Sequence, residues 1–300
     1  MEKKKKRWGD RPDGTRVRDL DSMHVFMPYM LPNRTDNEAF IQESVDLSAI
    51  NEFLAKKNAE NPEYKYTIFH AVTAAIAKTI YQRPKLNRFI TGRRLYERNE
   101  ILLAFVAKRI FSDDSDEILL LVNCDGDTTI DTLHDTICRR VSKGRKEGSV
   151  DDTTRIMNVL ARFPRFALRF IIGVLNFLEY HGRLPAFLRY ADPYHASVFI
   201  SNLGSIKLRA GYHHLANWGT NSVFVVVGEK HMETVADKDG NIKTAEMLPL
   251  GLTLDERIAD GYYYAKSVKL LKHLLENPAL LEIPASVPVA YEETKESVKA

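Results

Sequence analysis

Thiols and carboxylates at short, fixed spacings can hold a metal ion, and this sequence contains two groups to consider. Cys124 and Cys138 each lack a second cysteine at the spacing that zinc sites use, so a thiolate metal site is not expected. Asp237, Asp239 and Asn241 partly match a calcium loop, but no bidentate glutamate completes it, and a hairpin turn explains them better. Since the sequence also has no glycine-rich phosphate loop, it predicts neither a metal site nor a nucleotide site.

Proton transfer is the chemistry open to the remaining candidates. Asp255, Glu256 and Asp260 follow a predicted strand, and His213 and His214 are adjacent in a predicted loop. Imidazole, with a reference pKa near 6.5, is a better general base at neutral pH than a carboxylate near 4.3. Each candidate also has a plainer interpretation. The histidines can be ordinary loop residues, Glu256 a solvated carboxylate and Asp260 a helix N-cap.

Three further polar residues have structural interpretations. Ser201 lies at the end of a predicted strand, where a hydrogen bond within the fold would satisfy its hydroxyl. His70 lies in a helix dominated by apolar positions, and His195 stands just before a strand. Their positions alone do not identify any of the three as catalytic.

The elements that must position these residues follow from hydrophobic periodicity. Apolar residues recur at helical spacing from Thr67 to Gln82, and Arg83-Pro84 ends that helix. The other predicted helices cover residues 49–57, 129–144, 153–180 with a break or kink at Pro164, and 261–276. The predicted strands cover residues 40–47, 86–90, 94–98, 101–111, 117–123, 196–201, 221–227 and 247–254. Because strands and helices alternate irregularly, they predict an α/β fold with a mixed sheet and packed helices.

The composition is typical of a globular domain. Of the 300 residues, 44% are hydrophobic and 28% are charged, and the net charge of +3 does not favour a nucleic-acid binder. The basic run Lys3 to Arg7 is interpreted as a solvated tail, because no apolar signal segment follows it. Two cysteines in a chain of this size indicate a reducing compartment, so we expect a cytoplasmic protein.

The most apolar part of the chain is the stretch 156–188, which also contains Arg162, Arg165 and Arg169. Its uninterrupted apolar runs are too short for a membrane span of about 20 residues. A core or interface helix is the simplest interpretation of this stretch. A hydrophobic lid and a helix resting on a membrane surface are the alternatives, and membrane contact is not expected.

Three segments, in order along the chain, resemble one family of acyltransferases. Thr253-Leu-Asp-Glu-Arg-Ile-Ala-Asp-Gly261 resembles the HxxxDG signature of the dihydrolipoyl acyltransferases of 2-oxo acid dehydrogenase complexes and of chloramphenicol acetyltransferases. Phe199-Ile-Ser-Asn-Leu-Gly204 is similar to their Ser-Asn-Leu-Gly stretch. The helix from Thr67 ends in Arg83-Pro-Lys-Leu-Asn87, like their first core helix and its Pro-x-Leu-Asn exit. The departure is Glu256, which stands where the family has its catalytic histidine.

The resemblance implies a chloramphenicol-acetyltransferase-like two-layer sandwich, assembled as a homotrimer or a larger cage. It implies an acyltransferase-like domain over residues 36–284. An extended N-terminal arm over residues 1–35 and a disordered tail over residues 285–300 would flank it. In this family the active site lies between subunits.

The resemblance also implies a reaction, namely acyl transfer between coenzyme A and a small thiol, hydroxyl or amine acceptor. Coenzyme A or acyl-CoA would be a substrate, with no metal and no covalent lipoyl group on this chain. The motifs specify neither the acyl group nor the acceptor. Because the motif histidine is missing, the alternative is a catalytically inactive trimer that binds a ligand or serves as a scaffold.

Site residues carry over by motif position. Ser201 matches the serine that donates to the tetrahedral intermediate, and Asp260 matches the aspartate that orders the loop. Asn202 and Gly261 would set the backbone geometry beside them. Glu256 would be the base. The residues that can replace it are the two adjacent histidines, His213 and His214.

Overall fold

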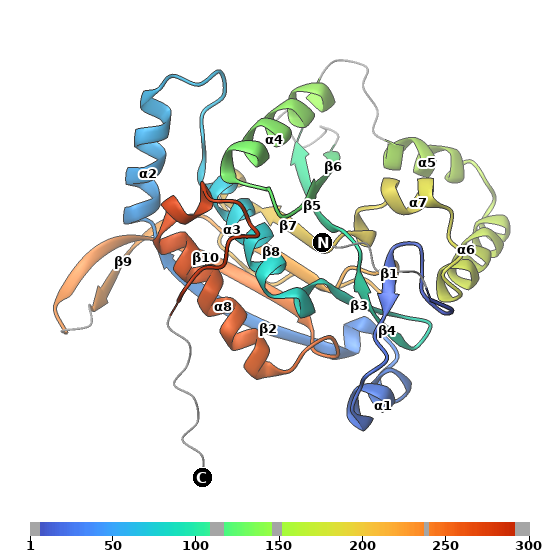
Figure 1. Cartoon of the computed structure of the whole chain (residues 1–300). Coiled ribbons are helices and arrows are strands. Elements are labelled where there is room, and N and C mark those ends of the chain that lie inside the picture. The colour runs from blue at the N-terminus through green and yellow to red at the C-terminus, as the bar shows by residue number, and fades with distance from the viewer. Residues whose placement is uncertain (1–6, 109–116, 146–151, 237–239, 292–300) are drawn as a thin grey trace, which may run out of the picture.

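The computed structural model describes residues 7–108, 117–145, 152–236 and 240–291. Most of the N-terminal basic run, the predicted strand end at 109–111, and two of the turn residues, Asp237 and Asp239, lie outside this described part. Within it the chain forms two sheets and eight α-helices (Figure 1).

The larger sheet has seven strands and is mixed, as predicted. Its order is β2-β10-β8-β7-β5-β6, with β9 paired to the far end of β10. β7 runs parallel to β5 and β8, and the other pairs are antiparallel. The strands of this sheet are β2 (Glu38–Asp46), β5 (Ile101–Lys108), β6 (Glu117–Cys124), β7 (Val198–Asn202), β8 (Val223–Val227), β9 (His231–Ala236) and β10 (Ile242–Asp255). The smaller sheet has the order β1-β4-β3 and consists of β1 (Gly14–Arg16), β3 (Arg88–Thr91) and β4 (Arg94–Arg98).

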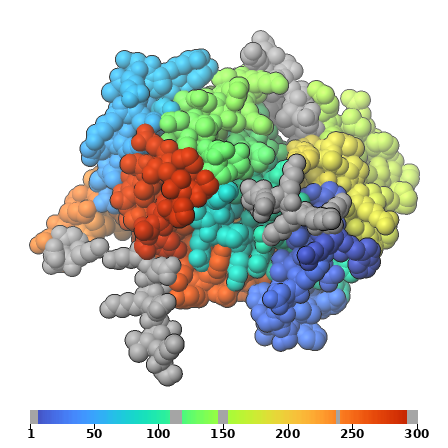
Figure 2. Space-filling model, viewed as in Figure 1, coloured from blue at the N-terminus to red at the C-terminus, as the bar shows by residue number. Residues whose placement is uncertain are grey.

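Helices cover one face of the larger sheet. In the view of Figure 2 they hide most of its strands. The eight helices are α1 (Ser22–Met30), α2 (Ser48–Ala59), α3 (Ile68–Gln82), α4 (Ile130–Arg145), α5 (Asp152–Leu160), α6 (Arg165–Tyr180), α7 (Ala186–Ala191) and α8 (Gly261–Glu276). α3 lies against α4 and α8, and these three with the sheet enclose the main hydrophobic core. α5, α6 and α7 gather at the edge opposite the β9–β10 hairpin (Figure 1).

α3 illustrates how sequence produces this core. The helix is capped by Thr67, whose backbone N–H donates to Nδ1 of His70 at 3.1 Å, in a reciprocal cap. All eleven residues from His70 to Ile80 are buried, so the helix is enclosed rather than amphipathic. It ends before Pro84, which cannot continue the hydrogen-bond ladder. The predicted helix from Thr67 to Gln82 is confirmed within one residue.

The other face of the larger sheet, here called the open face, carries a smaller cluster of buried side chains. Phe199 of β7 stacks on Phe224 of β8, with ring centroids 5.0 Å apart. Side chains alternate along a strand, so Ser201 lies on the same face as Phe199, while Ile200 faces the main core. The helices that bound the main core, α3, α4 and α8, do not pack on the open face. Irregular chain covers part of it instead.

The N-terminal residues differ from the expected extended arm. β1 pairs with β4 of the same chain, and α1 is a helix that begins at an aspartate N-cap, Asp21. Short sequence runs such as Gly14–Arg16 carry too little periodicity to predict a strand whose partner lies more than 80 residues away. The boundary of an arm at residue 35 stays a prediction.

Two other segments also refine the predictions. The predicted helical pattern over 153–180 is broken, with α5 and α6 separated by a turn and Pro164 serving as the N-cap of α6. In the predicted tail, Ala285 is buried and its N–H donates to the carbonyl of Thr128 at 3.0 Å. Residues 285–289 therefore pack on the domain, and residues 292–300 lie outside the described part.

Candidate active site

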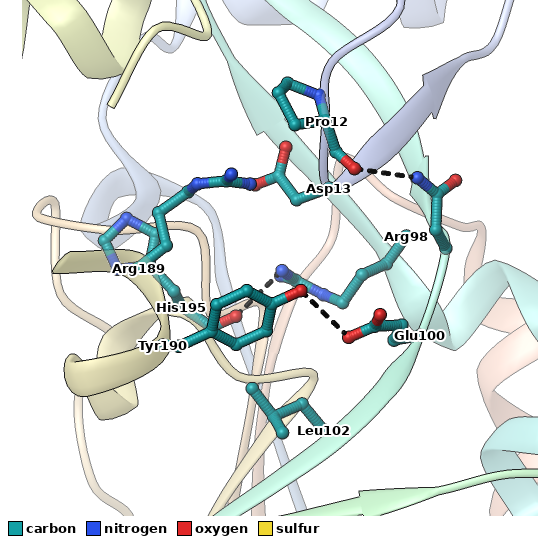
Figure 3. Close-up of a pocket in the computed structure, with 9 residues that line it drawn as sticks. Pro12, Asp13, Arg98, Glu100, Leu102, Arg189, Tyr190 and His195 are labelled. Atoms are coloured by element: carbon teal, nitrogen blue, oxygen red, sulfur yellow. Dashed lines mark hydrogen bonds and ion pairs between the residues drawn. The ribbon is translucent and has the colours of Figure 1, made fainter. Parts of the chain in front are cut away.

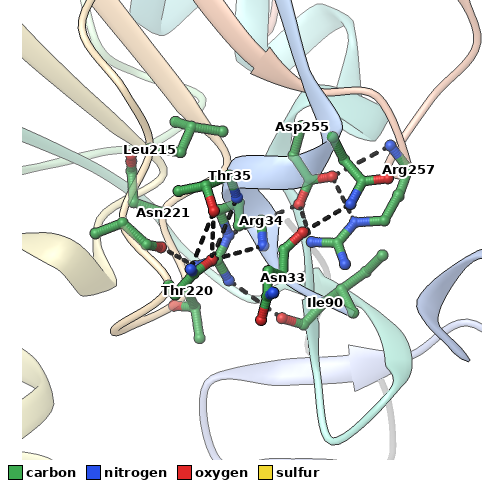
Figure 4. A network of polar contacts seen from close by, with 12 residues as sticks. Asn33, Arg34, Thr35, Ile90, Leu215, Thr220, Asn221, Asp255 and Arg257 are labelled. Atoms are coloured by element: carbon green, nitrogen blue, oxygen red, sulfur yellow. Dashed lines mark hydrogen bonds and ion pairs between the residues drawn. The ribbon is translucent and has the colours of Figure 1, made fainter. Parts of the chain in front are cut away.

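The end of β10 is fixed by a buried ion-pair network (Figure 4). Asp255, fully buried, accepts hydrogen bonds from Nε and Nη2 of Arg257 at 2.8 and 2.7 Å. Arg34, on the chain segment before β2, lies on the other side, with its Nε 3.7 Å from Oδ2 of Asp255. The hydroxyl of Tyr264 in α8 donates to the carbonyl of Asp255 at 2.7 Å. The turn from β10 into α8 is therefore held from three sides.

Glu256, at the motif histidine position, sits on this rigid turn but points to solvent. Its side chain is exposed, and its backbone N–H donates to the carbonyl of Asn37 at 2.9 Å. The neighbouring charges, Asp255 and Arg257, pair with each other rather than with Glu256. Within one chain, nothing in the described part encloses this carboxylate in the way that a catalytic base requires.

The motif aspartate has a structural role in this chain, and the motif glycine has none that the structure shows. Asp260 is the N-cap of α8, and its Oδ1 accepts from the N–H of Tyr263 at 2.8 Å. Gly261 begins α8, and a Cβ added there would meet no atom within 4 Å. The fold of a single chain therefore explains Asp260 but does not itself require glycine at 261.

Ser201 and Glu256 lie toward opposite ends of the sheet along the strand direction, and these two ends are called its edges here. Ser201 is opposite Val226 of β8, which in turn is opposite Gly251 of β10. Asp255 is four residues further along β10 and two strands away, so its Cα and that of Ser201 are roughly 16 Å apart. Ser201 and Glu256 of one chain cannot share one site.

Asn202 ends β7 and leads into a 3₁₀ helix, Leu203–Ile206, which turns the chain back over the open face. The carbonyl of Asn202 accepts a hydrogen bond from the hydroxyl of Ser205 at 2.7 Å. This bond closes the turn after β7, and the role of Asn202 beside a catalytic site stays a prediction.

Residues 207–216, here called the crossing segment, run across the open face from the Ser201 edge to the Glu256 edge. The backbone of the segment lies directly on two glycines. A Cβ at Gly228 would lie 2.2 Å from the nitrogen of Ala210, and one at Gly251 would lie 2.0 Å from the carbonyl oxygen of Gly211. At the far edge the N–H of Leu215 donates to Oε1 of Glu38. The close backbone contact fixes the segment in place.

His213 and His214 both belong to this segment. The ring of His213 stacks on Phe224, with centroids 4.1 Å apart. Nδ1 of His213 lies 2.8 Å from the carbonyl of His214, and Nδ1 of His214 lies 3.0 Å from the carbonyl of Leu215. Because a carbonyl can only accept, each Nδ1 carries the proton, and Nε2 of each neutral ring is left as the proton acceptor.

His213 lies on the same face of the sheet as Ser201. Phe224, on which the His213 ring stacks, lies on β8, the strand next to β7. It is two residues out of register with Ser201, so the Cα atoms of Phe224 and Ser201 are roughly 8 Å apart. Among the candidates from the sequence, the structure brings Ser201 and His213 together on one face. It leaves Glu256 and Asp260 at the other edge.

His70 forms a second histidine cluster, which faces α4 rather than the open face. Its Nε2 lies 3.9 Å from Sγ of Cys138, and the ring of His134 is next to it. Burial lowers the pKa of His70 to about 4 and raises the pKa of Cys138, so the pair is neutral and not an activated thiolate. Among the described residues no group of histidine, cysteine and carboxylate side chains has metal-binding geometry.

A buried charge cluster that the sequence did not predict joins α6 to the body of the domain. Glu179 accepts from Nη2 of Arg11 at 2.8 Å and lies 3.3 Å from Nε2 of His195, whose Nδ1 is 3.1 Å from Asp192. Burial alone would lower the pKa of His195, but its hydrogen bonds to Asp192 and Glu179 raise it. Burial would raise the pKa of Glu179, but His195 and Arg11 lower it.

This cluster borders a small cavity of about 40 Å³ (Figure 3). Arg98, Arg189 and Tyr190 line it, together with Asp13 and His195. Burial lowers the pKa of Arg98 to about 10, and its guanidinium donates to the carbonyl of His195 at 2.8 Å. The cavity is too small for an acyl-CoA or an acceptor molecule, so this cluster is structural.

Comparison with known proteins supports the motif-based resemblance. Residues 187–283 match the family described as 2-oxoacid dehydrogenases acyltransferase (catalytic domain). This chain resembles that catalytic domain. No curated protein matches the sequence. The matched acyltransferase region contains Ser201, the crossing segment and the turn with Glu256.

Solved acyltransferase structures share the fold across most of the chain. A probable dihydrolipoamide acetyltransferase from Listeria monocytogenes superposes with a TM-score of 0.57 at 14% identity, covering 88% of this chain and 95% of that chain. The cubic core of the pyruvate dehydrogenase multienzyme complex gives 0.52 at 16% identity, covering 88% and 93%. A chloramphenicol acetyltransferase gives 0.52 at 10% identity, covering 87% and 99%. The predicted chloramphenicol-acetyltransferase-like fold is confirmed.

Proposed function

We propose that this chain transfers an acyl group between coenzyme A and a small thiol, hydroxyl or amine acceptor. Ser201 stabilises the tetrahedral intermediate, and His213 takes the proton of the acceptor. The observation that supports this assignment is that Ser201 and His213 lie on one sheet face, since the His213 ring stacks on Phe224, two residues out of register with Ser201 on the neighbouring strand. The family match of residues 187–283 supports the reaction class.

The reaction then follows from the groups present. Nε2 of His213 accepts the acceptor proton as the acceptor attacks the thioester carbonyl. The Ser201 hydroxyl donates a hydrogen bond to the oxyanion that forms. When the intermediate collapses, the carbon–sulfur bond breaks and the coenzyme A thiolate leaves, taking the proton back from the imidazolium of His213. The result is an acylated acceptor and free coenzyme A.

Glu256 enters this proposal only through assembly. Since it lies at the edge opposite Ser201, it can face a Ser201 only if a neighbouring copy of the chain supplies that serine. A homotrimer with sites between subunits would bring them together. The cubic core among the fold relatives shows that this fold can build larger assemblies. Trimer, cage and cytoplasmic location stay predictions for this chain.

The test is acyl-CoA consumption by the purified protein, over a panel of thioesters and of thiol, amine and alcohol acceptors. Wild type is compared with Ser201→Ala, His213→Gln, His214→Gln and Glu256→Gln, with His181→Gln as a matched control. We expect His213→Gln to lose about 10²–10⁴-fold in kcat. Ser201→Ala should lose about 10²–10³-fold. The control and Glu256→Gln should keep wild-type rates.

The other outcomes separate the rival assignments. If Glu256→Gln is silent while His213→Gln turns over, the base is Glu256 and the site lies between subunits. If wild type is silent and Glu256→His gains activity, the natural protein has lost catalysis and a binding or scaffold role replaces the proposal. Silence of every variant, together with no binding of coenzyme A in calorimetry, would reject acyl transfer altogether.

A further inference from the structure

The outward surface of α5–α7 exposes large apolar side chains. Phe166, Phe170 and Phe177 of α6 are 79%, 73% and 62% exposed. Phe163 before α6 and Phe187 in α7 are exposed as well. We call this the α6 surface. Isolated exposed apolar residues are ordinary, but a contiguous group of phenylalanines marks a surface that binds something.

α6 is apolar over rather more than half of its circumference, and Arg165, Arg169 and Asn176 form its polar side. Leu168, Ile171 and Leu175 are turned toward the body of the domain and are partly buried. At 100° per residue, Phe166, Phe170 and Phe177 fall within a narrow stripe on the opposite side. The domain covers one part of this apolar arc and leaves the phenylalanine stripe exposed. An exposed apolar stripe of this kind indicates a surface that a partner covers.

Arginines border this stripe. From residue 153 to residue 191 the sequence has six arginines, and its only carboxylate is Glu179. Glu179 is buried and bound to Arg11 and His195, so its charge does not reach the surface. Five of the arginines are exposed, and Arg165 and Arg169 lie on one flank of the phenylalanine stripe. The partner of the α6 surface is therefore apolar inside and negatively charged outside.

A second copy of the chain docked through this same surface does not fit the charges. A two-fold contact places identical patches against each other, so the arginines of one copy would face those of the other. An anionic lipid bilayer fits both observations, since its acyl region accepts phenylalanine side chains and its headgroups attract arginine. None of the helices in the described part is long and apolar enough to cross a membrane, so the contact would be with the surface only.

We propose that the α6 surface binds the surface of an anionic membrane, with the phenylalanines of α6 inserted at the headgroup boundary. The buried charge cluster around Glu179 holds α6 against the domain, so the stripe is presented without prior rearrangement. The sequence alone favoured a core or interface helix, but the exposure of the phenylalanines shows that this helix is not buried in the core. This inference does not depend on the proposed catalytic function.

The test is flotation of the full chain with vesicles of phosphatidylcholine alone and of phosphatidylcholine with phosphatidylglycerol. Wild type should float with the anionic vesicles, and about 0.5 M salt should weaken this by screening. Phe166→Ser combined with Phe170→Ser should lower the partition coefficient by about tenfold or more. Arg165→Gln combined with Arg169→Gln should lower it about tenfold on anionic vesicles only.

Matched controls remove the same chemistry from other surfaces. Met232→Ser removes a comparably exposed apolar side chain from β9, and Arg139→Gln with Arg140→Gln removes two exposed charges from α4. Both should float like wild type. Failure of wild type to float would overturn the proposal, as would a loss of binding in the controls equal to that in the α6 variants. If the phenylalanine variant instead changes the oligomer mass in light scattering without changing flotation, the α6 surface is a subunit interface and the lipid proposal is wrong.

Discussion

On the helix-covered face of the seven-stranded sheet, α3, α4 and α8 enclose aliphatic side chains such as Ile200 and Leu250. On the open face, Phe199 and Phe224 stack beneath the crossing segment, and the ion-pair network of Asp255 fixes the strand ends. The helix-covered face is stabilised by the close packing of aliphatic side chains. The open face is stabilised by a few stacked rings, backbone contacts and buried charges.

This difference explains why the candidate site is on the open face. A fully packed face has no free polar groups or space for a substrate, because side chains there interdigitate at crystal-like density. The open face leaves Ser201 half-buried, and His213 lies over Phe224 on the same face. The proposed catalytic groups therefore lie on the open face, and the aliphatic core lies on the opposite face of the same strands. Substitutions can test this division directly.

The largest expected effect comes from charge on the open face. Asp255→Asn leaves two buried arginines, Arg34 and Arg257, facing a neutral amide, so we expect a loss of about 3–5 kcal/mol of unfolding free energy. Urea denaturation measures it. Asp260→Asn, which keeps an N-capping side chain at an exposed position, is the control and should change stability by less than about 0.5 kcal/mol. Equal losses in the two variants would show that the network does not hold the turn.

A smaller effect contrasts the two faces within one strand. Ile200→Ala empties volume on the helix-covered face and should cost about 2–5 kcal/mol of unfolding free energy. Its neighbour, Ser201→Ala, should change stability within about 0.5 kcal/mol while reducing turnover. Thermal unfolding and acyl-CoA consumption, measured on the same preparations, separate the two. The division between faces fails if Ser201→Ala unfolds the protein as readily as Ile200→Ala does.

The smallest effect is a pH dependence from the cluster that holds α6. The raised pKa of His195 gives stabilisation that is complete below its ordinary value of 6.5 and is lost as pH rises through the folded-state pKa. The lowered pKa of Glu179 gives stabilisation that is complete above 4.5 and is lost as pH falls through its folded-state pKa. The contribution of this pair to urea stability should therefore be complete between pH 4.5 and 6.5.

His195→Gln isolates the alkaline half of this dependence. The variant should lose the decline in urea midpoint above pH 6.5, because no imidazolium remains to be deprotonated at that position. The decline below pH 4.5 should become smaller but persist, because the hydrogen bond from His195 that lowers the pKa of Glu179 is lost while Arg11 remains. Parallel curves for wild type and His195→Gln above pH 6.5 would place the titrating group elsewhere.

Local sequence signals predicted the elements that local physics determines. The helix from Thr67 was predictable because its apolar spacing, its cap and Pro84 all lie within one short segment. The order of the three motifs was sufficient to predict the sandwich fold, because each motif combines a strand or helix with its exit. Local sequence could not decide whether Ser201 and Glu256 of one chain share a site. Strand register decides it, and the register places the two residues at opposite edges.

Long-range contacts account for what the sequence did not reveal. Arg34 and Asp255 meet across more than 200 residues, and neither has a spacing signal that would pair them. The ion pair of Arg11 with Glu179 is of the same kind, since their positions in the sequence differ by 168. The apolar pattern of α6 predicted a helix correctly, but only the structure shows which of its sides lacks a partner.

The two glycines beneath the crossing segment, Gly228 and Gly251, also bear on how the protein can be redesigned. The nearest atoms that they meet are backbone atoms of Ala210 and Gly211, so the course of the segment over the sheet is set largely outside Tyr212 to His214. Those positions can therefore be exchanged as a cassette, leaving the sheet unchanged while new side chains are presented beside Ser201. A single added methyl group at Gly251 would displace the whole cassette, which makes that glycine the position to leave untouched in any library.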